Sequence, residues 1–213
     1  VALRFEIMRK VHRKHKLFSY SKDMEDRATK YGYCHLIIEP RMAQKIVHSN
    51  GERAFIVAQL QDLLSPRLIL GDVPAHRQLA SCVDILAFSI TPKAIHLLVF
   101  TIDFTIAKDF AHRLAARLAQ YQSELRITDS TRDCEVRIKA ETLSGPHQAL
   151  SRSVAIHLLH EDWEYDRYSS IGFYLHDRRG DWMRIWRLAN LYEGESELYY
   201  ELVKSFLPSG FRV

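Results

Sequence analysis

The sequence has few of the residues and none of the short motifs from which several familiar kinds of functional site are built. Its three cysteines, Cys34, Cys82 and Cys134, are an odd number, lie far apart and form no Cys-x-x-Cys pair. It has only eight glycines, no glycine-rich phosphate-binding loop and no His-Glu-x-x-His zinc motif. We therefore interpret the cysteines as reduced core residues of a cytosolic protein, and we expect neither of these two kinds of site.

Long apolar runs are missing as well. No stretch reaches the length needed to cross a bilayer, and the first residues do not combine a charged start with an apolar block. Neither export nor membrane insertion is indicated, so we expect a cytoplasmic protein without a membrane partner. No internal repeat, low-complexity tract or flexible linker interrupts the sequence.

What the sequence does contain is enough apolar side chain for a folded core. Its 213 residues are 47% hydrophobic, which suits one globular domain with extensions. The formal net charge of +4 and a pI near 8.9 form a mild basic excess. This excess is compatible with a nucleic-acid partner, but it is equally that of an ordinary soluble protein, so charge alone favours neither interpretation.

Two consecutive stretches have the pattern of buried strands joined by a tight turn, and the rest of the chain is organised around them. Apolar residues occupy both faces of Val83 to Ile90 and of Ala94 to Thr101, with Thr91-Pro92-Lys93 between them. A lone His96 stands out in the second strand. Side chains two apart on a strand share a face, about 6 to 7 Å apart. Histidines at both 94 and 96 could bind one divalent metal, whereas His96 alone would bind it only weakly.

Helix-start signals and alternating stretches place further elements around these strands. Ser49-Asn50-Gly51 can start a helix, Asp103 or Thr105 can cap another, and Pro146 suits a first-turn position. Tyr121 fits the apolar stripe of the second helix, so we interpret it as core. The expected elements are a strand over 31–39, helices over 50–65 and 103–121, a strand over 134–142, a helix from 144 to about 160, and helices near 182–192 and 196–206. This order predicts an α+β fold with a central antiparallel sheet and helices packed on it.

Two terminal regions flank this core. Residues 1–30 are rich in Lys, Arg and His, and we expect a helical basic arm that is either phosphate-seeking or simply a solvated extension. Residues 176–213 are expected to form a helical extension. The aromatic residues that become dense after Trp163 could stack bases, but their helical spacing favours a core or a dimer interface.

The stretch Thr-Pro-Lys-Ala-Ile-His-Leu-Leu-Val over 91–99 resembles a known motif. It is similar to the Pro-Asn-His-x-His-Leu-Leu-Val strand of the single-tyrosine (Y1) transposases of the HUH superfamily, which include the IS200-like and REP-associated tyrosine transposases. Residues 135–140 resemble the family's Gln-Gly-Arg-Phe/Tyr-Lys segment, residues 155–160 its Tyr-Ile-His-x-Asn-Pro segment, and residues 163–175 its Trp-Ser-Ser-Tyr tail. The likeness covers roughly 31–175, and residues 66–80 depart from it as an insertion to which we assign no role.

The positions that carry the family's chemistry differ in this sequence. The first histidine of the strand motif is replaced by Ala94, the nucleophilic tyrosine by Ala155, and the Asn or Gln that completes the metal site by Leu159, while His96 is kept. In the family a tyrosine oxygen attacks a phosphodiester of single-stranded DNA while a metal polarises the phosphate. Alanine has no attacking atom, so we expect no enzyme activity and no cofactor.

The resemblance implies a ferredoxin-like, RRM-like HUH fold and a domesticated, catalytically inactive bacterial relative. Such a protein would bind DNA hairpins or single strands without cleaving them, as a nucleoid-associated regulator, and a homodimer is compatible with this role. Phosphate contacts give affinity independently of the lost chemistry. The basic residues expected on the binding surface are Arg41, Lys45, Lys93, Arg137, Lys139 and Arg152.

Other functions are compatible with the same residues. The chain could bind RNA instead of DNA, or it could be a protein-interaction or dimerisation module on a transposase scaffold, marked by an apolar patch on the tail. A third hypothesis is an enzyme with a relocated metal site built from His96, His157 and His160. For His157 we favour a structural hydrogen bond, because it matches a family histidine that is not a ligand.

Overall fold

The computed structural model describes residues 31–42, 44–64, 79, 82–125, 135–176 and 178–207. The expected basic arm, most of the insertion over 66–80 and Cys134 therefore lie outside the described residues. Within these residues the elements are, in order, β1 (Gly32–Pro40), α2 (Asn50–Leu64), β2 (Val83–Ile90), β3 (Ile95–Thr101), α3 (Phe104–Glu124), β4 (Val136–Leu143), α4 (Pro146–His157), η4 (Trp163–Tyr165), α5 (Ile171–Leu175), α6 (Trp186–Ala189) and α7 (Ser196–Phe206).

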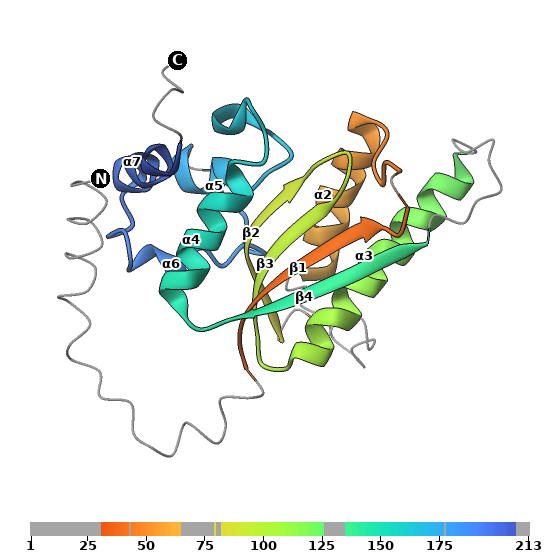
Figure 1. The fold of residues 1–213 in the computed structure, drawn as a ribbon, viewed down its shortest axis with the longest axis horizontal. Helices are drawn as coiled ribbons and strands as arrows, with labels where there is room; N and C mark the ends of the chain where they lie inside the picture. Colours follow the sequence, from red (N-terminus) through yellow and green to blue (C-terminus); the bar gives the residue numbers. More distant parts are fainter. Residues whose placement is uncertain are drawn as a thin grey trace.

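The four strands form one antiparallel sheet in the order β2-β3-β1-β4 (Figure 1). The connectivity is strand, helix, two strands, helix, strand, so each crossover passes over the strand that lies between its ends. This confirms the predicted α+β class with helices packed on an antiparallel sheet. The strand with the family-like motif, β3, has a neighbour on each side, as its apolar composition predicted.

One face of the sheet forms a largely apolar core under α2 and α3, which pack against each other and against the strands (Figure 1). From β1 this face receives Cys34, Leu36 and Ile38, none more than 1% exposed. These residues alternate with His35 and Ile37, which point to the opposite face, because successive strand residues do so. Lys108 of α3 acts electrostatically on the Cys34 thiol, which places Cys34 on the α3 side.

The opposite face is crossed by α4, and α6 and α7 pack on α4 in turn. The chain after α4 also covers the outer edge of β2, since the Ile90 amide donates to the Tyr168 carbonyl and the Ser170 amide to the Phe88 carbonyl. Residues after 176 contribute to the same core, including Trp182, Tyr192 and the fully buried Tyr199. The interpretation of the tail aromatics as core is confirmed for these three residues.

The starts of α2, α3 and α4 follow the predicted signals, but other predicted bounds are wrong: α3 continues to Glu124, and the helix expected near 182–192 is only Trp186–Ala189. The Ser49 hydroxyl accepts from the Glu52 amide while the Glu52 carboxylate accepts from the Ser49 amide, a capping box, and Asp103 caps α3. The predicted end of α4 near His160 is wrong, since the helix ends at His157. Its last turn tightens, with the Leu159 amide donating to the Ile156 carbonyl at 3.4 Å.

None of the helices within the described residues combines the length and the apolar character that crossing a bilayer requires.

Candidate functional site

His96 is not alone on the sheet, which corrects the sequence interpretation. His35 on β1 lies beside it, with 3.2 Å between His35 Nε2 and His96 Nδ1 and the two rings stacked at 5.4 Å between centroids. The register pairs Ile37 with His96 and His35 with Leu98, so the histidines are diagonal neighbours on one face. His35 was missed because only strand register, which a single strand's pattern does not reveal, brings it next to His96.

The histidine pair is neutral at ordinary pH. Burial lowers the pKa of His35 to about 3, and the neighbouring His96 and Arg152 lower it further. Burial also lowers the pKa of His96 to about 4, with Glu39 opposing the shift. His35 is 4% exposed and its Nδ1 has no hydrogen-bond partner; the Glu141 carboxylate is 4.0 Å away. The fold therefore leaves an unsatisfied nitrogen here, which is uncommon for a buried polar atom.

The positions that resemble the family's catalytic residues carry no reactive group. Ala94 precedes β3 and is 7% exposed. It lies in a turn where the Thr91 hydroxyl accepts from the Ala94 amide and donates to the Ala94 carbonyl. Ala155 lies on the exposed side of α4, and Leu159 is 43% exposed after the helix. Methyl and isobutyl groups thus occupy the places where the resemblance puts a metal ligand and a nucleophile.

Five of the six expected basic residues lie in two groups on the molecule. Arg137 and Lys139 on β4 both pair with Glu39, and Lys139 Nζ lies 2.8 Å from its carboxylate. Hydrogen bonds from Lys139 and Arg137 lower the pKa of Glu39. Arg152 of α4 pairs with Glu141 of β4 at 2.7 Å, so it joins the same face.

The second group consists of Lys45 and Lys93. The Ile46 amide donates to the Pro92 carbonyl at 2.9 Å, which holds the chain before α2 against the β2-β3 turn. Both lysines are exposed, and neither makes an ion pair with another described residue. Arg41, directly after β1, instead pairs with Glu135 at 2.9 Å.

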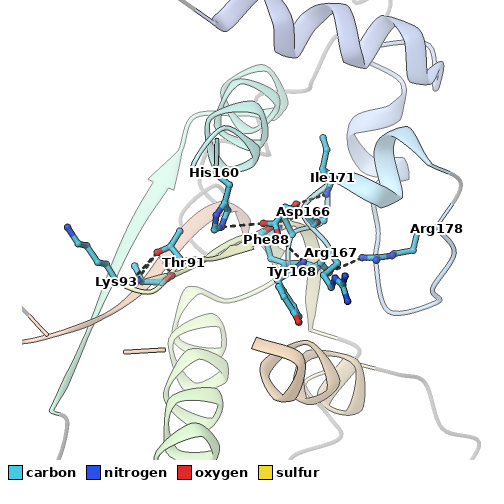
Figure 2. A network of polar contacts seen from close by, with 12 residues as sticks. Phe88, Thr91, Lys93, His160, Asp166, Arg167, Tyr168, Ile171 and Arg178 are labelled. Atoms are coloured by element: carbon cyan, nitrogen blue, oxygen red, sulfur yellow. Dashed lines mark hydrogen bonds and ion pairs between the residues drawn. The ribbon is translucent and has the colours of Figure 1, made fainter. Parts of the chain in front are cut away.

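The three histidines of the relocated metal site do not come together. His157 is fully buried, with Nδ1 2.8 Å from the Tyr199 hydroxyl and Nε2 2.6 Å from the Ser170 hydroxyl, and burial lowers its pKa to about 3. His160 instead faces Asp166 at 3.2 Å (Figure 2). In the part of the chain that the structure describes, no group of three or more His, Cys, Asp or Glu side chains could hold a metal ion.

A pocket of about 540 Å³ opens beside the end of α4. Its lining includes Leu159 and His160, the loop residues Asp166, Arg167 and Tyr168, and Arg53 from the first turn of α2. No function is predicted for Arg53, Asp166 or Arg167 from the sequence. No local pattern marks them, since they converge only because the loop after α4 folds back over the edge of β2.

Comparison with protein-family models, with curated proteins and with solved structures found no match.

Proposed function

We propose that this protein is a catalytically inactive, transposase-like protein that binds DNA hairpins or single-stranded DNA without cutting it. The strand order β2-β3-β1-β4 and the two crossover helices agree with the ferredoxin-like arrangement that the resemblance to the Y1 transposases implies. They support the proposal without distinguishing an HUH protein from other proteins with this topology.

The observation that carries the proposal is the meeting of two family-like segments that are sixty residues apart in the sequence. The helix α4, which contains Ala155, packs across one face of the sheet. The side chain of His96 on β3 points to the same face. Arg152, one turn before Ala155, and His160, just after the helix, both act electrostatically on His96. The helix motif and the strand motif therefore lie on the same side of the sheet, which supports the proposal.

The same face explains why binding can persist without cleavage. Tyrosine attack needs a hydroxyl at 155, and this position is alanine, whereas a phosphate contact needs only a cation. Arg137 and Lys139 are 56% and 49% exposed, so their ion pairs with Glu39 are partly solvated. Pairs of this kind contribute about 0 to 1 kcal/mol, and a phosphate can therefore displace Glu39 at little cost.

The proposal is tested by titrating the purified chain into labelled DNA hairpins, single strands and duplexes at about 50 and 200 mM salt. We expect binding that weakens steeply with salt, because each neutralised phosphate releases counterions. Denaturing gels of the same mixtures should show uncut DNA. An absence of binding to every DNA at the lower salt contradicts the proposal, and a preference for RNA hairpins of the same sequence assigns the site to RNA.

One observation favours a second function, protein interaction through a sheet edge. Among the described strands β4 pairs only with β1, and five of its eight residues are exposed. An open edge can accept another strand by backbone hydrogen bonding. Sedimentation at rising protein concentration tests this alternative: a dimer that a proline at Ala140 abolishes supports it, and a monomer throughout contradicts self-association through this edge.

A further inference from the structure

Two arginines lie together in the pocket beside the end of α4. The guanidinium carbons of Arg53 and Arg167 are 5.6 and 6.0 Å from the centroid of the same ring, that of Tyr168. Neither arginine forms an ion pair with another residue that the structure describes, although Glu161 and Asp162 also line the pocket. Guanidinium groups without an anionic partner suit a phosphate, to which each can donate charge-assisted hydrogen bonds.

The loop that carries Arg167 and Tyr168 is held in place by its backbone. The Tyr168 carbonyl accepts from the Ile90 amide of β2 at 3.3 Å, and the Arg167 carbonyl accepts from the Arg178 guanidinium at 3.3 Å (Figure 2). Asp166 Oδ1 accepts from the Tyr168 amide at 2.9 Å. The side chain of Asp166 is only 10% exposed, so it positions this loop and does not contact a ligand. A pocket wall that is fixed beforehand binds its ligand at a smaller cost in ordering.

An aromatic ring lines the same pocket. Tyr165 is 79% exposed, and its ring stacks on the imidazole of His176, with centroids 5.8 Å apart and planes 11° from parallel. His176 Nε2 donates to the Glu164 carbonyl at 3.0 Å, which holds the imidazole in position. A ring that is covered on one face and open on the other can stack a nucleobase of any kind. The pocket volume of about 540 Å³ lies within the range of small-molecule sites.

From the two arginines, the fixed loop and the exposed ring we infer that this pocket binds a nucleoside phosphate, with its phosphate groups at Arg53 and Arg167 and its base on Tyr165. A free nucleotide and an unpaired nucleotide of a single strand present the same phosphate and the same base. Glu161 and Asp162 oppose phosphate, but both are exposed, so water and salt screen their charge. The inference goes beyond the proposed function, because the site lies outside the basic face of the sheet and does not need that face.

The first test titrates the full chain in a calorimeter with ADP, adenosine and inorganic pyrophosphate, in EDTA and at about 50 mM salt, where phosphate contacts are strong. We expect ADP to bind about tenfold or more tightly than either of the other probes, because ADP alone has both a base to stack and phosphates to pair. ADP that does not bind, or that binds no better than pyrophosphate, overturns the inference.

Variants separate the two parts of the pocket. Arg53→Gln and Arg167→Gln should each weaken both ADP and pyrophosphate, by about five- to tenfold. Tyr165→Leu should weaken ADP by about the same factor and leave pyrophosphate unchanged, because only the base stacks. Arg113→Gln, at a partly buried arginine of α3, is the matched control and should change neither. Unchanged thermal midpoints verify that the variants fold, and an equal loss of ADP affinity in the control overturns the pocket.

A fluorescein-labelled strand of five thymidines identifies the source of the nucleotide. If this strand binds more tightly than ADP, and if Arg53→Gln and Tyr165→Leu both weaken it, the pocket holds a nucleotide of a single strand. If ADP binds but does not displace the strand, the ligand is a free nucleotide. Hairpins that bind while ADP does not overturn the pocket alone. ADP that binds while no DNA binds at low salt overturns the proposed function alone.

Discussion

The two faces of the sheet differ in the kinds of side chain that they carry. Under α2 and α3, the β1 residues Cys34, Leu36 and Ile38 are at most 1% exposed, and none of their side chains carries a nitrogen or oxygen atom. Under α4, the same strand presents His35, whose buried Nδ1 lacks a partner, and Glu39, which binds two cations. The side chains of the first face are those expected of an apolar core that stabilises the fold. The second face has polar and charged side chains that such a core would not need.

The largest expected effect that separates the two faces is acid sensitivity. Burial lowers the pKa values of His35, His96 and His157 to about 3, 4 and 3, and all three lie on the α4 side. The unfolded chain protonates these groups near pH 6.5, so their contribution to stability is complete above that pH and is lost as the pH falls towards 3. Urea denaturation between pH 7.5 and 4 should show a falling midpoint.

Removing one of these groups reduces the acid effect. His35→Gln should lower stability at pH 7.5 but flatten its fall below pH 6.5, because one fewer proton is taken up on unfolding. His176→Gln, an exposed histidine, is the control and should leave the slope unchanged. A midpoint in the wild type that is constant down to pH 4 would mean that the α4 side does not hold its histidines neutral.

The next effect in size tests the apolar face. Leu36→Ala should reduce the free energy of unfolding by about 2 to 5 kcal/mol, because it removes a fully buried side chain and leaves a cavity. Lys139→Ala, on the neighbouring strand β4 and on the other face, should change it by less than about 0.5 kcal/mol. Chemical denaturation at pH 7.5 measures both, and equal losses would erase the distinction between the faces.

The smallest expected effect tests the role of Glu39, the acidic partner of two cations on the α4 side of the sheet. Glu39→Gln removes the negative charge that Arg137 and Lys139 share, so DNA affinity should rise by about two- to fivefold while stability changes little. Asp109→Asn on the exposed surface of α3 is the charge-matched control. Anisotropy with one hairpin at about 100 mM salt measures both, and an equal rise in the two variants would reduce the effect to net charge.

The sequence predicts the apolar face better than the polar one, for a physical reason. Alternation and helix-start signals are local, so the strands, the capping box at Ser49 and the cap at Asp103 follow from short stretches. His35 meets His96 only through the β1-β3 register, and Asp166 meets His160 only through the loop after α4. Contacts that depend on strand register or on loop packing cannot be predicted from any single stretch of the sequence. The candidate site is therefore predicted only in part, through His96 and the basic residues.

The basic residues show the same limit of prediction from sequence. Exposure of Lys45 and Lys93 could be anticipated from their place beside turns, but the ion pairs of Arg137, Lys139 and Arg152 could not. Their partners Glu39 and Glu141 come from neighbouring strands or from the sheet under α4. A candidate list of cations therefore overstates the free positive charge unless the register is known.

The measurement that tests the central claim most directly is the salt-dependent binding of a DNA hairpin to the triple variant Arg137→Ala, Lys139→Ala, Arg152→Ala, compared with Lys108→Ala. If the α4 side of the sheet binds phosphate, the triple variant should lose about tenfold or more in affinity and show a shallower salt slope, by up to about 3, while Lys108→Ala matches the wild type. Equal affinities and slopes in all three proteins would contradict the claim that this face binds nucleic acid.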